Sequence, residues 1–142
     1  MMKTSKKGLS LIEVLFAMGI LGIVLTFIGY AFTQSAYQGA STKNKIGAMN
    51  DVKKMLEQVR TVADKNGLTG PNSVTDGTYW TNAGNGWLET QTFSNLSTPA
   101  RTIIFPSGTG GNPLRVRATV TWQEKTGTRS YFMETLATKR TA

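Results

Sequence analysis

The chain has 142 residues, with 16 basic and 8 acidic side chains, a formal net charge of +8, and neither histidine nor cysteine. This composition excludes Ser-His and Cys-His nucleophile pairs, thiolate and imidazole metal sites, and disulfide bonds. We therefore expect a protein that is not an enzyme and that holds no metal and no cofactor.

The first eight residues form a basic segment that ends in a glycine. They contain three lysines and no acid, whereas the 22 residues from Leu9 to Tyr30 contain no basic side chain and one acid, Glu13. As a helix this stretch would be about 33 Å long, which matches a hydrocarbon core of roughly 30 Å. We predict a membrane-spanning helix at residues 9–30, with a cytoplasmic N-terminus because the lysines lie on that side.

The junction Gly8-Leu9-Ser10-Leu11-Ile12-Glu13-Val14-Leu15 resembles the type III signal sequence of the type IV pilin and pseudopilin superfamily. Only Leu9 departs from the commonest pattern, which has Phe at that position. In that family a membrane aspartic peptidase cuts after the glycine and N-methylates the new first residue. The resemblance implies that residues 1–8 are a leader, that cleavage follows Gly8, and that Leu9 becomes the methylated N-terminus.

The single acid in the apolar stretch, Glu13, is a functional candidate, because a carboxylate inside a membrane segment usually has a role. No cation lies between Leu9 and Tyr30. The remaining candidate partner is the amine of Leu9 after processing, in the same subunit or the next. The resemblance favours the next subunit, since in pilins this glutamate pairs with a neighbouring N-terminus during assembly. The alternative is that Glu13 only extends its carboxylate to the membrane interface.

Two further features of the apolar stretch bear on assembly. Gly22, Thr26 and Gly29 fall near one helical face and would permit close helix approach, although glycine is also common in membrane helices generally. Many major pilins have a helix-breaking proline where this chain has Tyr30. That difference favours a minor pilin or a pseudopilin.

Residues 31–66 predict a continuation of the same helix with an amphipathic pattern. Apolar residues recur at steps of three or four: Ile46, Met49, Val52, Leu56, Val59 and Ala63, flanked by Met55 and Val62. Asn66-Gly67 is a plausible helix stop, with Gly67 just past the end. One helix should therefore run from about Leu9 to about Asn66, and its second half should pack on a soluble domain.

Residues 67–142 read as a β-rich domain outside the cytoplasm. A strand is expected at 87–93, and strict alternation predicts another from residue 114 with one buried face. The inward residues of that strand are Leu114, Val116, Ala118, Val120 and Trp122. A loop of about five residues should lead to a returning strand, giving a C-terminal hairpin over 114–138. The fold class is α+β, with the long helix packed on a small antiparallel β-sheet.

The hairpin also resembles minor pilins of the pilus-modification group and related secretion pseudopilins. Together the two resemblances imply a structural subunit, a minor pilin of a type IV pilus or pilus-like filament. It would be anchored by one span in the inner membrane and then enter a periplasmic or surface filament. Its partners would be other pilin or pseudopilin subunits and the prepilin peptidase/N-methyltransferase. The alternatives are a minor pseudopilin of type II secretion and a competence pilin that captures DNA.

DNA is a possible but less favoured partner. Removal of the leader would leave 13 basic and 8 acidic side chains. Arg115 and Arg117 share one strand face, and Arg129 is expected across from them. Four aromatic residues could stack on bases: Tyr79, Trp80, Trp87 and Tyr131. The simpler interpretation is a solvated outer sheet face, with the aromatic residues in the core.

Overall fold

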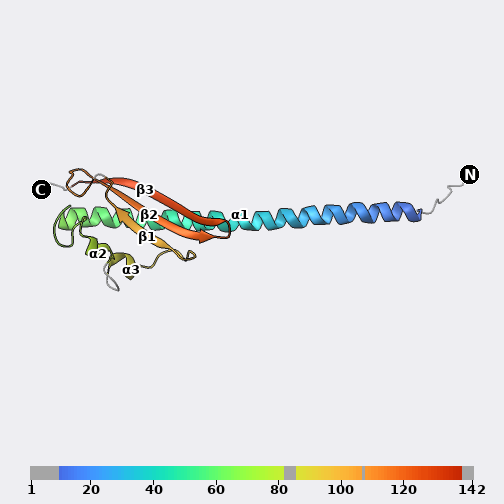
Figure 1. The fold of residues 1–142 in the computed structure, drawn as a ribbon, viewed down its shortest axis with the longest axis horizontal. Coiled ribbons are helices and arrows are strands. Elements are labelled where there is room, and N and C mark those ends of the chain that lie inside the picture. The colour runs from blue at the N-terminus through green and yellow to red at the C-terminus, as the bar shows by residue number, and fades with distance from the viewer. Residues whose placement is uncertain (1–9, 82–85, 107, 139–142) are drawn as a thin grey trace, which may run out of the picture. The chain divides into compact units, whose positions relative to one another are not determined.

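The structure is a computed structural model that describes residues 10–81, 86–106 and 108–138. Its elements in chain order are α1 (Leu11–Asn66), α2 (Gly77–Thr81), α3 (Trp87–Thr90), β1 (Ala100–Ile104), β2 (Leu114–Glu124) and β3 (Gly127–Ala137) (Figure 1). The chain divides into two compact units, residues 1–40 and residues 41–142, and α1 supplies helix to both.

Helix α1 is 56 residues long and contains no proline. It ends as the sequence predicts. Gly67 follows it with φ at 83°, a left-handed conformation that glycine adopts without steric cost, and its backbone amide donates to the Ala63 carbonyl at 3.2 Å. This is a typical glycine-terminated helix end.

In the second unit, residues 41–66 of α1 bury one face against the sheet. The buried residues of this segment are Ala48, Asp51, Val52, Met55, Leu56, Val59, Val62 and Ala63. The predicted stripe was therefore partly wrong, because Ile46 is 49% exposed, Met49 is only half-buried, and Met55 and Val62 lie at the centre of the contact. Steps of three or four allow more than one apolar line along a helix, and the sheet selects the line that meets it.

The sheet is antiparallel, with strand order β1-β2-β3. Strands β2 and β3 pair over their full length without a bulge, from Leu114 opposite Ala137 to Glu124 opposite Gly127. Only two residues connect the strands, so the predicted loop of about five residues was wrong. Gly127 makes the short connection possible because its φ of 122° is accessible to glycine but strained for other residues.

The predicted inward face of β2 is confirmed. All five residues are buried: Leu114, Val116, Ala118, Val120 and Trp122. The first two join a core cluster with Val59, Val62 and Trp80, and the other three join a second cluster with Val52 and Met55. The α+β fold class is confirmed, since a long helix packs on a three-stranded antiparallel sheet.

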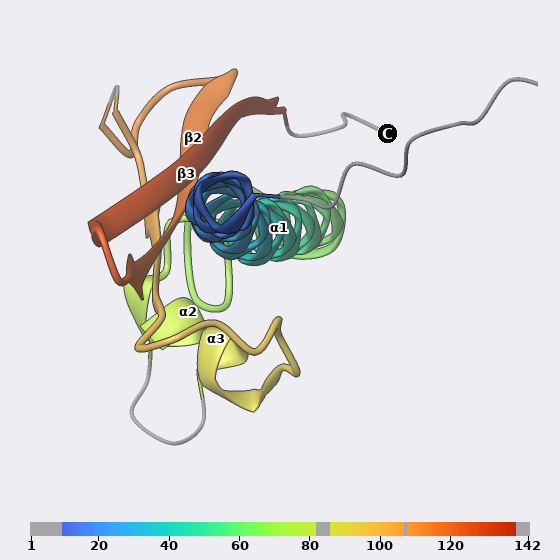
Figure 2. The same ribbon diagram turned by 90° about the vertical axis from the view of Figure 1, so that its right-hand side faces the viewer.

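The segment between α1 and the sheet was not predicted correctly. Trp87 begins the short helix α3 rather than a strand, and Trp80 lies in α2; the two helices pack together (Figure 2). Trp80 is buried and its indole Nε1 donates to the Val74 carbonyl at 2.8 Å. It also meets the rings of Tyr79 and Trp87 edge-on. These aromatic residues anchor short helices, so their preference for strands is overridden by packing.

A buried ion pair fastens the chain that leads into β1. Asp51 of α1 accepts a hydrogen bond from the Arg101 guanidinium at 2.9 Å and another from the Ser94 backbone amide at 2.9 Å. The helix approaches so closely here that a Cβ on Gly47 would lie 3.1 Å from the Ser94 side chain. This arrangement holds segment 92–96 against α1.

Candidate processing and assembly site

Of the three residues expected to carry function at the N-terminus, the structure describes one. Gly8 and Leu9 lie outside the described residues. Glu13 lies in the first turn of α1, and its backbone amide donates to the Ser10 carbonyl at 2.9 Å. A carboxylate in the first turn interacts favourably with the partial positive charge of a helix N-terminus.

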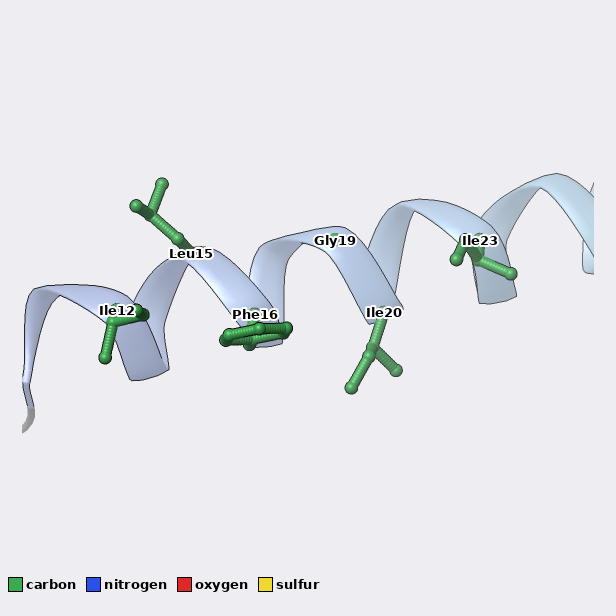
Figure 3. A pocket seen from close by; sticks show the side chains of 6 residues that line it. All are labelled: Ile12, Leu15, Phe16, Gly19, Ile20 and Ile23. Atoms are coloured by element: carbon green, nitrogen blue, oxygen red, sulfur yellow. The ribbon is translucent and has the colours of Figure 1, made fainter.

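The surface around Glu13 is apolar and uncovered. All residues of α1 from Leu11 to Ala40 are exposed, and Figure 3 shows large apolar side chains projecting from the first turns of the helix. They are Ile12, Leu15, Phe16, Ile20 and Ile23. An apolar surface of this extent is unfavourable in water, so this helix needs lipid or other protein around it.

Two threonine hydroxyls in this segment are satisfied by carbonyl groups of the same helix. The hydroxyl of Thr26 donates to the Gly22 carbonyl at 2.9 Å, and that of Thr33 donates to the Gly29 carbonyl at 2.9 Å. Neither hydroxyl needs water, which suits an apolar environment. A Cβ added at Gly22 or Gly29 would meet nothing within 4 Å, so the surface at both glycines is open to another helix.

The cations that precede Glu13 in the sequence, Lys3, Lys6 and Lys7, belong to the predicted leader and lie outside the described residues. The sequence contains no lysine or arginine between Lys7 and Lys43. No ion pair in residues 10–81, 86–106 and 108–138 involves Glu13. The stretch around it reaches a mean hydropathy of 2.5 over 18 residues, so α1 is long and apolar enough to cross a membrane. Glu13 is thus an acid on an apolar helix, and among the described residues it forms no ion pair.

A family profile described as the prokaryotic N-terminal methylation motif matches residues 3–29. The chain carries the prepilin-type motif of the type IV pilin and pseudopilin superfamily. Comparisons with curated proteins and with solved structures found no match.

Several expectations follow directly from the prepilin-type motif. Proteins of the pilin family are structural and not enzymes, so the prediction of a non-enzymatic chain is confirmed. The motif implies processing by a prepilin peptidase and assembly with other pilins. Together with the apolar helix it indicates anchoring in the inner membrane before assembly.

The second candidate site, the basic and aromatic surface, is not assembled as expected. Arg115 and Arg117 do share the outer face of β2, but Arg129 pairs in register with Trp122 and therefore lies on the opposite face. Trp80 is buried at 2% exposure and cannot stack on a base. Tyr131 is half-buried and packs against the core.

Sequence reasoning also missed three exposed apolar residues on the outer sheet face: Ile104, Phe132 and Leu136. Phe132 and Leu136 alternate with the inward residues Tyr131 and Met133 in the sequence, which could have indicated their direction. Their position beside the two arginines depends on strand register, which the sequence does not show.

Proposed function

We propose that this chain is a minor pilin, a structural subunit of a type IV pilus or a pilus-like filament. The observation that carries the proposal is the exposed apolar first part of α1, residues 11–30, soon after the Gly8-Leu9 junction; its first turn carries one acid, which forms no ion pair among the described residues. In this proposal Gly8 is the last residue of a leader at 1–8, and Leu9 becomes the methylated N-terminus. The lysines of the leader favour a cytoplasmic N-terminus.

Assembly follows from the charges. The new amine of Leu9 would be the nearest cation to a Glu13 carboxylate, and residues 9–30 supply an apolar helix with open surface at Gly22 and Gly29. A pairing between Glu13 of one subunit and Leu9 of the next is a head-to-tail contact that does not close, and such contacts build filaments. Residues 31–66 continue this helix, and from residue 41 they belong to the same compact unit as residues 67–142.

Processing is the first prediction. The chain is expressed with an active prepilin peptidase, extracted from membranes and measured by intact mass. We expect loss of residues 1–8 and gain of one methyl group. Gly8→Leu, which puts a bulky side chain at the cut, should remain full-length, whereas Thr4→Ser should be processed as the parent is. A mature N-terminus other than Leu9 would contradict the proposal.

The type of filament is tested separately, by isolating the processed chain with its neighbours after crosslinking. Recovery with pilus subunits from sheared surface filaments supports a minor pilin. Recovery only with pseudopilins of a type II secretion system would assign the chain to that machine. Loss of DNA uptake without loss of filaments, on removal of the chain, would assign it to competence.

A further inference from the structure

The outer face of the sheet carries an unusual group of exposed apolar side chains. Within the described part of residues 41–142, four large apolar residues are more than about two-fifths exposed: Ile46, Ile104, Phe132 and Leu136. Ile46 lies on α1. The other three come from β1 and β3, with exposures of 45%, 55% and 59%, and they share the outer face.

Strand register places these residues around two arginines. Arg117 of β2 lies opposite Ile104 on one side and opposite Glu134 on the other, and Arg115 lies opposite Leu136. Opposite residues in a sheet have Cβ atoms about 4.5–5.5 Å apart, so their side chains are in contact range. The Arg117 guanidinium lies 4.9 Å from the centroid of the Phe132 ring. The six residues therefore form one surface, which we call the outer-face patch: Ile104, Arg115, Arg117, Phe132, Glu134 and Leu136.

The charges in the outer-face patch do not balance. Arg117 Nε donates to Glu134 Oε1 at 2.7 Å, and Arg115 Nε lies 3.8 Å from Glu134 Oε2. One carboxylate thus serves two guanidinium groups, and one positive charge is left over. Arg115 is the looser of the two and its side chain is 56% exposed. A carboxylate from another molecule would complete its pairing.

We propose that the outer-face patch binds a partner protein that presents a carboxylate next to apolar side chains. Arginine and aromatic residues are enriched at the centres of protein interfaces, and Arg117 is held in place by Phe132 and Glu134 before any partner arrives. The exposed apolar side chains of Ile104, Phe132 and Leu136 lie around these charged groups, and exposed apolar groups rimmed by polar residues are typical of an interaction site. The charge left on the arginines selects for an acidic partner.

The composition of the patch argues against other occupants. Nucleic acid binding draws its affinity from many phosphate contacts, and the patch offers one uncompensated charge. A lipid surface would gain only about 1 kcal/mol from one such arginine. Since α1 covers the inner face of the sheet, a partner on the outer face would not compete with contacts made by the helix. The proposal extends beyond filament assembly and does not depend on it.

The test uses the full chain in nanodiscs of zwitterionic lipid, screened against a random peptide library after depletion on empty nanodiscs. We expect the enriched peptides to carry Asp or Glu beside apolar residues. Selected peptides are then synthesised and their dissociation constants are measured for the parent and its variants. Phe132→Thr, which keeps a residue suited to strands, should weaken binding about tenfold or more.

A charge series separates the proposal from simple hydrophobic adhesion. Glu134→Gln should tighten binding of the same peptides, and Arg115→Gln/Arg117→Gln should weaken it. Ile46→Thr removes an equally exposed apolar side chain outside the patch and should leave binding unchanged. Tryptophan fluorescence of each variant verifies its fold. The proposal is overturned if enriched peptides lack carboxylates, if Phe132→Thr binds as the parent does, or if duplex DNA or anionic vesicles bind tighter than the peptides and lose that binding with the same substitutions.

Discussion

Trp122 lies where the sheet meets α1, and its two ends face different surroundings. It is 4% exposed and belongs to the core cluster with Val52 and Met55, while its indole Nε1 donates to Glu124 Oε1 at 2.9 Å. Truncation of a buried tryptophan to alanine costs about 3–5 kcal/mol, against a total stability of about 5–15 kcal/mol for a typical domain. We therefore expect Trp122→Ala to unfold at a much lower urea concentration, followed through the fluorescence of Trp80 and Trp87.

Arg117→Ala is the matched control on the same strand. Arg117 points to the opposite face, and its pair with Glu134 is exposed to solvent. Surface ion pairs contribute about 0–1 kcal/mol, so this variant should unfold close to the parent. Equal urea midpoints for Trp122→Ala and the parent would mean that the two faces of β2 are interchanged, as a slip of one residue would cause.

Glu124 makes the stability of the domain depend on pH. The Trp122 indole, the Ser41 hydroxyl, Asn44 and Arg129 together hold the pKa of Glu124 below its ordinary value of 4.5, although partial burial opposes them. A depressed folded-state pKa means that the carboxylate stabilises the fold above pH 4.5 and that this contribution is lost as pH falls through the lower, folded-state pKa.

The matching variant is Glu124→Gln, which keeps the shape and removes the charge. It should be less stable than the parent at neutral pH, and the difference should shrink as pH falls below 4.5. Thermal unfolding at several pH values gives the comparison. A constant difference across that range would show that Glu124 acts through shape and hydrogen bonding alone. Hydrogen bonds from Thr78 and Asn72 lower the pKa of Asp76, so its contribution to folding stability is also lost in acid. This loss should be the same in the parent and in Glu124→Gln.

At the scale of elements, the clearest sequence patterns gave the correct structure. Strict alternation from Leu114 to Trp122 predicted a strand with a known inner face, because a period of two has only one structural solution. The end of α1 was also predictable, because Gly67 supplies a local signal that needs no tertiary information. The carboxylate of Glu13 in the apolar stretch was visible in the same way, as a single charge against a uniform background.

Other elements depend on contacts that no local pattern encodes. Strand β1 has only five residues. Two of them, Arg101 and Ile103, face the inner side of the sheet, and one of these is charged. Its arginine is acceptable there because Asp51, fifty residues earlier, neutralises it. Helices α2 and α3 are fixed by Trp80 and Trp87, whose types favour strands. The outer-face patch likewise exists only once β1, β2 and β3 are in register.

Helix α1 should need Glu13 for assembly and not for insertion. The thirteen Leu, Ile, Val and Phe residues of 9–30 favour insertion by roughly 0.3–0.6 kcal/mol each. Their sum, roughly 4–8 kcal/mol, exceeds the cost of about 2.5–3.5 kcal/mol for one carboxylate at mid-bilayer. Glu13→Ala should therefore be inserted and cleaved. A charge-assisted hydrogen bond contributes about 1.5–3 kcal/mol. Because Glu13→Ala loses this bond, the recovery of the variant in sheared filaments should drop roughly tenfold or more.

Glu13→Gln separates charge from shape in that experiment. If a neighbouring Leu9 amine is the partner, the glutamine variant should fail nearly as badly as the alanine variant. Normal incorporation of both variants would mean that the carboxylate only reaches the membrane interface. Quantitative blotting of sheared material against the membrane fraction measures the difference.

At the scale of the whole molecule, the four arginines of the three strands each form an ion pair with a carboxylate, so they do not present a free basic surface. Asp51 pairs with Arg101, Glu124 with Arg129, and Glu134 with two further arginines. We therefore expect duplex DNA to bind the full chain in nanodiscs no tighter than the nonspecific range of roughly 10⁻⁴–10⁻⁶ M, with affinity that falls steeply with salt. Fluorescence anisotropy at several salt concentrations tests this. Sub-micromolar binding at physiological salt that disappears in Arg115→Ala/Arg117→Ala would show a dedicated DNA site.

The order of the elements along the chain determines how long the buried face of α1 stays uncovered during synthesis. The helix face that ends at Ala63 leaves the ribosome well before β2, the strand that covers it, is complete at Glu124. At about 5–20 residues per second, the roughly sixty residues between them take ~3–12 s to synthesise. For all of that time Val52, Met55 and Val59 have no sheet to pack on, while residues 9–30 are already apolar enough to enter a bilayer. The apolar segment can thus enter the bilayer before the soluble domain folds. Until β2 is synthesised, the apolar face of α1 around Val52, Met55 and Val59 is the surface of the nascent chain that needs protection from water.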